Sequence, residues 1–366
     1  MTTGTTPYTK TASGTRAASH RVQVLVASGT PDGILAFDLD LVSAELVYKG
    51  VAAKIGNVCW ITFSPDHKYL YAACEVDSFN AKPTGNVASF SVVNGRLIPL
   101  SAQNSASAGT CHVAVDQTGR VLLSADYSGG SAASFLTNAG QLSPAAWTEH
   151  YNSPGPNTDR QTSAHAHFAS FSPDNRFAYI NDLGGNCIHF YRLNSVTAGL
   201  TPVGVYQAHR GAGPRTLHFH PNGHTAYSVN ELDSTVDVLE WSPADGSLTL
   251  LESMQLLPKP YIGPTRASDA LISGDGRHVY FANRDNDFVY RFHADTRTGK
   301  LTPICRTNCG GRSPRHFVLD PTECWMLVAN EDSNLVCVFA RNPRTGELAE
   351  TGVSFGVAAP KCILFS

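Results

Sequence analysis

The chain repeats one pattern of hydrophobic and polar positions, and its clearest copy is residues 165–182, HAHFASFSPDNRFAYIND. A short apolar run leads into a Ser-Pro-Asp-Asn turn, and a second alternating run rich in aromatic and β-branched residues follows. This order predicts a β-hairpin. Every copy places Pro, Gly, Asn or Asp in its turn, and the copies centre on Phe63, Val115, Phe171, Phe219, Ile272 and Leu319.

The two ends of the chain complete each other in the same pattern. Residues 361–365 look like a first strand with no partner after it, whereas residues 23–28 look like a second strand with no first. With position 365 as a seventh centre, the spacings are 52, 56, 48, 53, 47 and 46 residues, a period that suits four-stranded propeller blades. We therefore predict an all-β, seven-bladed β-propeller with antiparallel blades, closed by pairing the N- and C-terminal strands.

The repeat accounts for residues 22–366 as a single domain. A hydrophobic content of 42%, a charged content of 16% and 31 Gly indicate a core-forming chain with many turns. Residues 1–21 are rich in Ser, Thr and Ala and carry Lys10, Arg16 and Arg21 without any acid. We expect a disordered N-terminal tail there, with a transit peptide as the alternative.

Charge and cysteine content exclude several classes of partner. A net charge of −3 without long runs of like charge argues against a nucleic-acid binder, and no apolar stretch is long enough to span a membrane. Nine cysteines without a secretory signal indicate reduced thiols and a cytoplasmic setting. Cys305 and Cys309 have no second ligand pair nearby, so we expect no metal and no cofactor. The oligomeric state stays open.

Strand polarity places many ionisable residues on one rim of the ring. The first strand of each hairpin starts where the second ends, so these positions share a rim and the turns face the other. Four positions before each centre stand Cys59, Cys111, His167, Arg215, Ser268, Arg315 and Lys361. The second strands end at Asp126, Asp182, Asn230 with Glu231, Asn283 with Arg284, and Asn330 with Glu331.

These residue types suit the binding of a small anion. Guanidinium groups match carboxylate and phosphate, and a His with a Glu supplies a proton-transfer pair. The residues expected to be structural, by bridging blades or satisfying neighbours, are Asp126, Asp182, Asn330, His218 and His220. His165 and His167 would share a strand face by the two-residue period. Without a third ligand we do not expect them to bind a metal.

Four motifs resemble those of the seven-bladed lactonase family, which includes propeller-type 6-phosphogluconolactonases and 3-carboxymuconate lactonizing enzymes. The resemblance extends from about residue 23 to 365. The motifs are Gly155-Pro156-Asn157 with Arg160-Gln161 and His165-Ala166-His167; Gly211-Ala212-Gly213-Pro214-Arg215 with Val229-Asn230-Glu231-Leu232; Ala282-Asn283-Arg284; and Ser313-Pro314-Arg315 with Ala329-Asn330-Glu331. The resemblance implies lactone chemistry without a required metal, and it maps functional residues of the family onto His167, Arg215, Glu231 and Arg284.

The leading hypothesis is hydrolysis of a small anionic sugar lactone, with 6-phosphogluconolactone as the expected substrate. His167 or Glu231 would take a proton from the attacking water, and Arg215 would stabilise the oxyanion. The expected substrate-binding residues are Arg284, Arg315, His165, Arg160, Asn230 and Lys361. A muconate-type cycloisomerase and a non-catalytic binding platform are the alternatives.

The sequence departs from the family pattern at four positions. The departures are Ala164 where Pro is usual, Glu331 where Gln is usual, Glu323 in place of a turn Gly, and His316 where Asn is common. Glu331 adds a negative charge at the rim. The departures therefore bear on the identity of the substrate more than on the predicted fold.

Overall fold

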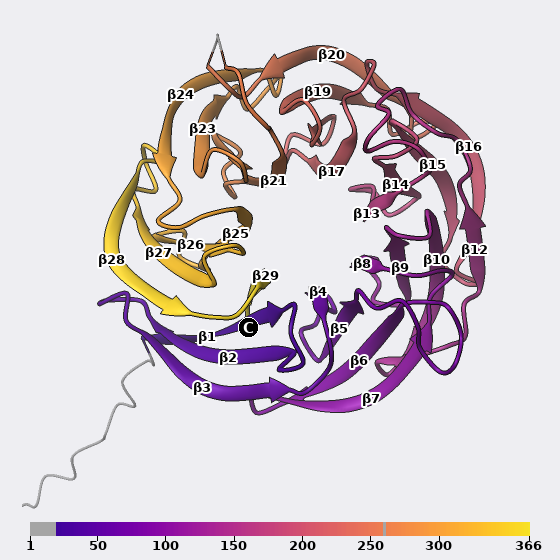
Figure 1. The fold of residues 1–366 in the computed structure, drawn as a ribbon, viewed down its shortest axis with the longest axis horizontal. Helices are drawn as coiled ribbons and strands as arrows, with labels where there is room; N and C mark the ends of the chain where they lie inside the picture. Colours follow the sequence, from indigo (N-terminus) through magenta and orange to yellow (C-terminus); the bar gives the residue numbers. More distant parts are fainter. Residues whose placement is uncertain (1–19, 259–260) are drawn as a thin grey trace, which may run out of the picture.

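The computed structural model describes residues 20–258 and 261–366. Throughout these residues the regular elements are β-strands, and they form seven antiparallel sheets arranged around one axis (Figure 1). The predicted seven-bladed propeller is therefore confirmed. Most of the predicted tail, residues 1–19, lies outside the described residues, and β1 begins at Arg21, the last residue assigned to that tail.

We number the blades from the first complete hairpin. Blade 1 contains β4 (Val58–Phe63), β5 (Tyr69–Cys74), β6 (Asn86–Val93) and β7 (Arg96–Asn104). Blade 2 contains β8 (Thr110–Val115), β9 (Val121–Asp126), β10 (Ser131–Asn138), β11 (Gln141–Leu142) and β12 (Trp147–His150). Blade 3 contains β13 (Ala166–Phe171), β14 (Phe177–Asp182), β15 (Cys187–Asn194) and β16 (Gly199–Gln207).

The remaining blades have the same order, from the inner strand outward. Blade 4 contains β17 (Pro214–Phe219), β18 (Thr225–Asn230), β19 (Thr235–Trp241) and β20 (Leu248–Gln255). Blade 5 contains β21 (Ala267–Ile272), β22 (His278–Asn283), β23 (Phe288–Ala294) and β24 (Leu301–Asn308). Blade 6 contains β25 (Pro314–Leu319), β26 (Trp325–Asn330), β27 (Leu335–Arg341) and β28 (Leu348–Gly356).

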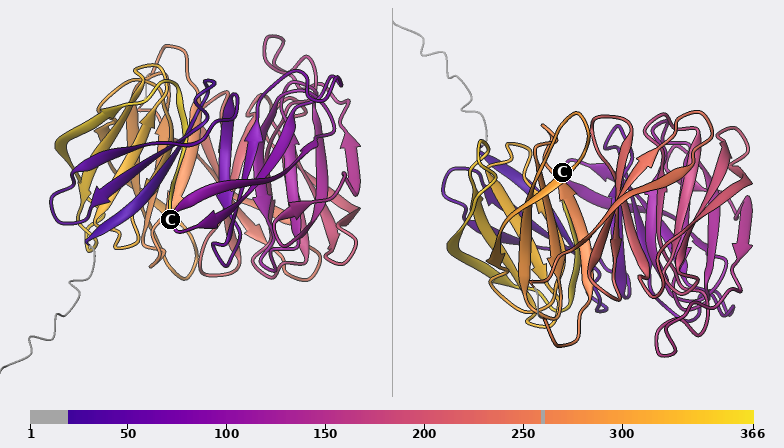
Figure 2. Two further views of the ribbon diagram at one scale, coloured as in Figure 1. Left: turned by 90° about the horizontal axis from the view of Figure 1, so that it is seen from below. Right: turned by 90° about the horizontal axis from the view of Figure 1, so that it is seen from above.

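Blade 7 joins the two ends of the chain. It contains β29 (Pro360–Phe365), β1 (Arg21–Ser28), β2 (Ile34–Asp40) and β3 (Leu46–Ala53). The antiparallel pairing of β1 with β29, from Val24↔Phe365 to Ala27↔Cys362, is the predicted closure. Side views show the strands of all blades running between two rims, with loops projecting from both (Figure 2).

Blade 2 departs from the four-stranded prediction because its outer strand is divided. The short strand β11 pairs with one end of β10, at Thr137↔Leu142, and β12 pairs with the other end, from Ser131↔His150 to Ser134↔Trp147. The segment after β12, residues 151–165, leads to the site rim described below. The described chain has no helix long and apolar enough to cross a membrane.

Buried tyrosines fasten neighbouring blades to one another. The hydroxyl of Tyr179 donates to the carbonyl of Gly246 at 2.7 Å, and that of Tyr227 donates to Gly299 at 2.7 Å. Each glycine lies in the turn before the outer strand of the next blade and has a positive φ, 79° for Gly246. A Cβ atom on Gly246 would lie 2.5 Å from the ring of Phe177, so the close approach of the blades requires glycine there.

Candidate active site

A β-bulge recurs at the start of every inner strand. The register between the first two strands shifts at one position in blades 1 to 4, 6 and 7, and across two positions in blade 5. The residues at these shifts include the set singled out in the sequence: Cys59, Cys111, His167, Arg215, Ser268, Arg315 and Lys361. A bulge leaves its extra residue outside the ladder and redirects its side chain, which explains how the sheets present this set at one rim.

The residue directly after each second strand forms a second set at the same rim. This set is Gly29, Glu75, Tyr127, Leu183, Glu231, Arg284 and Glu331. Register pairs such as Pro214↔Asn230 and Pro314↔Asn330 place both sets at one end of the hairpins. We call this end of the ring the site rim.

Glu231 is the centre of the site rim because three guanidinium groups converge on it. Its Oε2 lies 3.1 Å from Arg215 Nε and 2.7 Å from Arg284 Nη2, while its Oε1 lies 2.8 Å from Arg160 Nη2. The side chains of Arg215, Arg284 and Glu231 are at most 7% exposed. The carboxylate therefore holds cations from blade 4, from blade 5 and from the segment before blade 3.

Backbone contacts position this cluster. The amide of Glu231 donates to the carbonyl of Gly213 at 2.8 Å, so the Gly-rich segment before β17 sets where Glu231 leaves the sheet. Gly213 has a φ of 67°, and a Cβ atom there would lie 2.6 Å from the side chain of Leu232. Arg215 also donates through Nη1 to the carbonyl of Ser268 in blade 5.

Arg160 reaches Glu231 from a segment that Gln161 fastens. The buried Gln161 amide donates to the carbonyl of Leu183 at 2.7 Å, and its Oε1 accepts from the backbone of Asn157 at 2.9 Å. Arg160 itself donates to the hydroxyl of Tyr127 at 3.0 Å. The motif from Gly155 to Gln161 is thus a folded loop that directs the Arg160 guanidinium toward Glu231.

A second group of ion pairs occupies the side of the rim formed by blades 6, 7 and 1. Arg315 Nη1 lies 3.0 Å from Glu331 Oε2, and its Nη2 lies 3.4 Å from Cys59 Sγ. Lys361 Nζ lies 2.6 Å from Glu75 Oε2. Glu331, identified in the sequence as a departure from the family pattern, therefore neutralises part of the charge of Arg315.

His167 lies beside these cations, and no described residue forms an ion pair with it. Its Nδ1 is buried and has no hydrogen-bond partner among the described residues. Burial lowers the pKa of His167 well below 6.5, and the charge of Arg215 lowers it further, against a smaller opposing effect of Glu231. The imidazole is accordingly neutral near pH 7.

His165 and His167 do not show the regular alternation expected of them. The bulge between Ala166 and Phe168 removes His167 from the ladder, and His165 lies before the first residue of β13. The ring of His165 stacks on Tyr127 with 4.5 Å between centroids, whereas His167 meets Tyr127 edge-on at 5.5 Å. Both rings therefore flank Tyr127, and His165 Nδ1 lies 2.9 Å from the Tyr127 carbonyl oxygen.

The arginines keep Glu231 ionised. Burial raises the pKa of the Glu231 carboxyl, but Arg284 and Arg215 outweigh this effect and hold the pKa well below its usual value. For Arg284, burial is the largest effect and lowers the pKa to about 10, although Glu231 opposes it. In this cluster of buried charges, the ionised form of each group is stabilised by the opposite charges beside it.

The two groups of ion pairs at the site rim, around Glu231 and around Arg315 and Lys361, together carry an excess of positive charge. Their cations are Arg160, Arg215, Arg284, Arg315 and Lys361, and their carboxylates are Glu75, Glu231 and Glu331. Five cations against three carboxylates leave a local excess of two positive charges in a protein whose formal net charge is −3. Such a local field favours an anionic ligand.

Below the rim, a narrow chamber of about 10 Å³ is lined by Arg215, Arg315, Lys361 and His167 among others. One layer of rings closes its floor: Trp60 packs on His112 with 4.4 Å between centroids, and His112 packs on Phe168 at 3.9 Å. The chamber has room for about one water-sized group. Any larger ligand would have to lie above this chamber, on the solvent side of the site rim.

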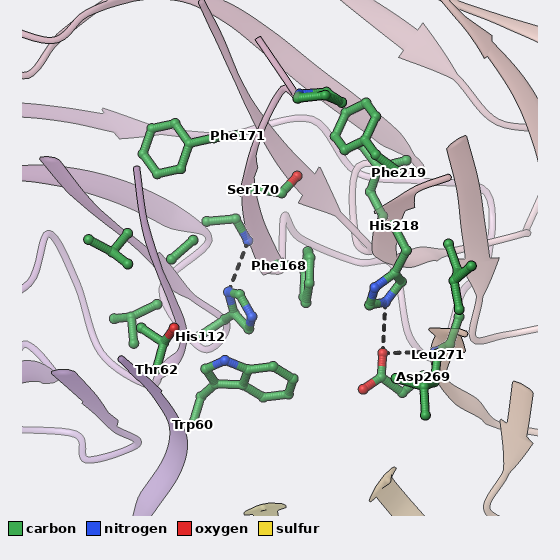
Figure 3. Close-up of a pocket in the computed structure, with 18 of the residues that line it drawn as sticks. Trp60, Thr62, His112, Phe168, Ser170, Phe171, His218, Phe219, Asp269 and Leu271 are labelled. Carbon is green, nitrogen blue, oxygen red and sulfur yellow. Dashed lines mark hydrogen bonds and ion pairs between the residues drawn. The ribbon is translucent and has the colours of Figure 1, made fainter. Parts of the chain in front are cut away.

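A larger cavity of about 710 Å³ lies on the other side of this layer (Figure 3). It is lined by Pro173 and Pro221 of the hairpin turns, so it faces the rim opposite the site rim. His218 Nε2 lies 2.8 Å from Asp269 Oδ1 within it, and His220 Nε2 lies 2.8 Å from the carbonyl oxygen of Gly276. These contacts agree with the structural role expected for both histidines.

Not every predicted substrate-binding residue has a side chain that faces the chamber at the site rim. Asn230 is fully buried, and its amide donates to Thr235 Oγ1 at 2.9 Å, between β18 and β19. Conversely, sequence reasoning missed Tyr127 and Glu75, which contact Arg160 and Lys361. Their signal was positional, because each directly follows a second strand in the same way as Glu231.

Comparison with known proteins identifies the family of the chain. The family described as "Lactonase, 7-bladed beta-propeller" matches residues 23–365. The chain is 30% identical to a 6-phosphogluconolactonase of Bacillus subtilis, over 92% of this chain and 95% of the relative. It is 29% identical to a 6-phosphogluconolactonase of Formosa agariphila, over 86% and 90% of the two chains.

A solved structure shows the same architecture. The periplasmic gluconolactonase of Pseudomonas aeruginosa superposes with a TM-score of 0.88 at 28% identity, over 94% of this chain and 99% of that chain. The family match extends over all seven blades and includes the bulge residues and the ion-pair cluster around Glu231. The chain therefore belongs to the seven-bladed β-propeller lactonase family.

Proposed function

We propose that this protein hydrolyses a small anionic sugar lactone, with 6-phosphogluconolactone as the substrate and 6-phosphogluconate as the product. The observation that carries the proposal is the excess of positive charge in the two ion-pair groups of the site rim, with a neutral His167 beside their guanidinium groups. The names of the relatives from Bacillus subtilis and Formosa agariphila support the same reaction. A phosphorylated lactone has the charge that this rim would attract.

In the proposed reaction His167 is the general base. It accepts a proton from water as the water oxygen bonds to the lactone carbonyl carbon, and Arg215 stabilises the oxyanion. The ring C–O bond then breaks, and the imidazolium returns the proton to the leaving alkoxide. Glu231 is the weaker candidate for the base, because Arg284 and Arg215 keep its pKa well below the usual value. We assign it to holding the arginines in place.

The anionic group of the substrate would bind Arg315, with Lys361 beside it, and Arg284 and Arg160 would approach the substrate from the side of Glu231. The reacting carbonyl would lie between His167 and Arg215, which line the same chamber as Arg315. His165 and Asn230 remain predicted binding residues; His165 stacks on Tyr127, whereas Asn230 is fully buried.

An unphosphorylated gluconolactone is the second candidate substrate. The Pseudomonas aeruginosa relative is named a gluconolactonase without a phosphate, and here Glu331 lies 3.0 Å from Arg315. This ion pair reduces the positive charge available to a phosphate. A phosphorylated and an unphosphorylated lactone must therefore be compared directly.

The deciding experiment is pH-stat hydrolysis of freshly prepared 6-phosphogluconolactone beside gluconolactone, each corrected for spontaneous opening. Our proposal predicts acceleration of both, with the larger kcat/KM for the phosphorylated substrate. Acceleration of gluconolactone alone would shift the assignment to the unphosphorylated substrate. If the folded protein opened neither ring but closed a carboxymuconate to its lactone, the cycloisomerase would replace this proposal. No turnover of any of these substrates would favour a binding platform.

The pH dependence of kcat/KM tests the role of His167. The base must be neutral, so activity is lost as pH falls through its pKa. Burial and Arg215 place that pKa well below 6.5, and we expect full kcat/KM at pH 6.5 with an acid limb at lower pH. His167→Ala is expected to lower kcat by about 10²–10⁴-fold and to remove this limb. An unchanged limb in the variant would assign it to another group.

Glu331 is expected to weaken the binding of the phosphate. Glu331→Gln removes the charge that lies 3.0 Å from Arg315 and leaves this guanidinium free to bind an anion. We expect KM for 6-phosphogluconolactone to fall by about tenfold, equivalent to about 1.4 kcal/mol, with little change in kcat. KM for gluconolactone serves as the control and should not change. An equal fall for both substrates would mean that Arg315 does not bind the phosphate.

A further inference from the structure

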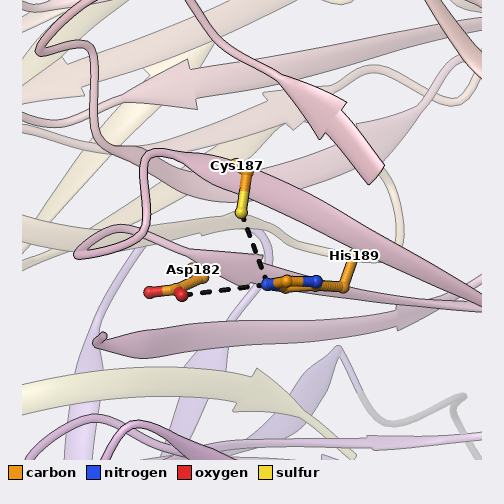
Figure 4. A group of neighbouring side chains, drawn as sticks. All are labelled: Asp182, Cys187 and His189. Atoms are coloured by element: carbon orange, nitrogen blue, oxygen red, sulfur yellow. Dashed lines mark hydrogen bonds and ion pairs between the residues drawn. The ribbon is translucent and has the colours of Figure 1, made fainter. Parts of the chain in front are cut away.

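Three metal-ligating residue types meet on one face of blade 3, away from the ion pairs of the site rim. Asp182 is the last residue of β14, and it lies opposite Cys187, the first residue of β15. Opposed residues of an antiparallel pair share a face, and His189 lies on that face because it is two residues beyond Cys187. Figure 4 shows the Cys187 sulfur and an Asp182 oxygen each joined by a dashed line to the same ring nitrogen of His189.

The distances suit three ligands of one ion. His189 Nε2 lies 3.3 Å from Cys187 Sγ and 3.8 Å from Asp182 Oδ2, and the three atoms lie within 4.8 Å of one another. Zinc bonds of about 2.0–2.3 Å in a tetrahedron separate neighbouring donors by roughly 3.3–3.8 Å. Both separations from His189 Nε2 fall within that range, and the remaining pair of donor atoms, Cys187 Sγ and Asp182 Oδ2, lies within 4.8 Å.

The carboxylate of Asp182 supplies a second, independent observation. Asp182 is fully buried, and its Oδ1 accepts from the backbone amides of His165 at 2.7 Å and Gly185 at 2.8 Å. Its Oδ2 faces Cys187 and His189, and it has no hydrogen-bond donor in the part of the chain that the structure describes. A buried carboxylate oxygen without a donor is costly, and a cation would satisfy it.

The repeat provides an internal comparison for this carboxylate. Asp126 holds the equivalent position in blade 2, and there its Oδ2 accepts from Ser131 Oγ and from the amides of Ala106 and Ser107. Blade 2 thus satisfies its buried carboxylate with protein donors. In blade 3 the corresponding oxygen faces a thiol and an imidazole instead.

Blades 1, 2, 4, 5 and 6 do not combine three ligand types at these positions. The equivalent trios in the described chain are Cys74, Asn86 and Ala88; Asp126, Ser131 and Ala133; Asn230, Thr235 and Asp237; Asn283, Phe288 and Tyr290; and Asn330, Leu335 and Cys337. The fold itself therefore does not require a Cys and a His here. The set in blade 3 is specific to that blade.

We propose that Asp182, Cys187 and His189 bind one zinc-type divalent ion, with water in the fourth position. Thiolate and imidazole ligands select zinc over magnesium or calcium, and a carboxylate completes a common zinc ligand set. Binding displaces the thiol proton of Cys187 to solvent, so the site holds a thiolate, a carboxylate and a neutral imidazole. This departs from the sequence-based expectation of no metal, which considered only Cys305, Cys309 and the pair His165 and His167.

The ion would order the chain that leads into the site rim. Asp182 Oδ1 accepts the amide of His165, two residues before His167. A metal on Oδ2 would fix this carboxylate and with it the start of β13. Tyr151 stacks on His189 with 4.2 Å between ring centroids, so the segment before β13 also covers the site. The proposed role is structural, and it does not depend on the proposed lactone hydrolysis.

The test uses the full chain after removal of metal with a chelator. Titration with Co²⁺ alone should give one equivalent of tetrahedral cobalt bands together with a thiolate-to-cobalt charge-transfer band, and Zn²⁺ should displace both. Cys187→Ser and Asp182→Asn should each weaken Co²⁺ binding by more than about 100-fold. Asp182→Asn keeps an oxygen for the two backbone amides. Cys305→Ser changes an exposed cysteine elsewhere and is the matched control.

Thermal unfolding provides a second measurement that does not depend on the cobalt absorption bands. Zn²⁺ should raise the midpoint of the wild type and of Cys305→Ser but leave that of Asp182→Asn unchanged. Circular dichroism establishes that each variant is folded. The proposal is overturned if the wild type shows no stoichiometric charge-transfer band, or if the band persists in Cys187→Ser.

Discussion

Arg215→Ala is expected to lower kcat/KM for 6-phosphogluconolactone by about 10²–10³-fold, the usual cost of losing one donor to a developing oxyanion. Arg215 lines the chamber that also contains His167, and its Nε and Nη1 are engaged by Glu231 and by the Ser268 carbonyl. These contacts fix the guanidinium before the substrate arrives. Preorganisation of this kind makes the loss appear mainly in kcat.

The measurement is initial-rate pH-stat kinetics with both lactones, combined with the unfolding midpoint of each variant. Arg215→Lys retains the charge but loses the two-pronged donor, and it should recover only part of the rate. Arg277→Ala is the matched control, because Arg277 is 62% exposed and lies at the hairpin turn of blade 5. If Arg215→Ala kept its kcat and lost only affinity, Arg215 would belong to anion binding and not to the reacting carbonyl.

The fold was predictable because its signal is repeated seven times. Each hairpin brings its own turn residues, and the spacing of the centres indicates the number of strands in a blade. The closure of the ring followed from two incomplete ends, at 23–28 and 361–365, which pair as β1 and β29. Because the same strand and turn pattern recurs in every blade, a weak signal in one strand does not change the predicted fold. The divided outer strand of blade 2, which occurs once, was not predicted.

The rim was predictable from strand polarity, but the contacts within it were not. Polarity places Arg215 and Glu231 at one end of their hairpin, yet a period of two cannot reveal the bulge that redirects His167 and Arg215. Nor does it choose ion-pair partners: Glu231 binds three guanidiniums, whereas Glu331 binds Arg315. Those choices depend on side-chain packing between blades, which a single sequence does not report.

The cluster of Asp182, Cys187 and His189 shows the same limit. Asp182 was expected to be structural, and the sequence alone does not mark Cys187 and His189 as its partners, because the five-residue gap from Asp182 to Cys187 is no standard metal-ligand spacing. Only the pairing of β14 with β15 brings Asp182 opposite Cys187. Ligand sets formed across a hairpin become visible once the register is known.

Glu231→Gln is expected to have the largest effect on stability. The substitution keeps the shape of the side chain but leaves Arg215 and Arg284, whose side chains are 4% and 7% exposed, without their common counter-charge. Removing one partner of a buried ion pair costs about 3–5 kcal/mol. Urea unfolding should show this loss as a lower midpoint with an unchanged slope. Glu45→Gln is the control, because its ion pair with Arg21 is exposed and its removal should have little effect.

Inorganic phosphate distinguishes a counter-charge role from a purely steric one. In Glu231→Gln three guanidiniums share a site without a carboxylate, so phosphate should bind there and restore part of the lost stability, by more than it stabilises the wild type. Added chloride at matched ionic strength controls for general screening. If the variant were as stable as the wild type, or if phosphate stabilised both equally, the arginines would not depend on Glu231. The Glu231 carboxylate would then be free to act as the general base, and His167 would no longer be the preferred candidate for that role.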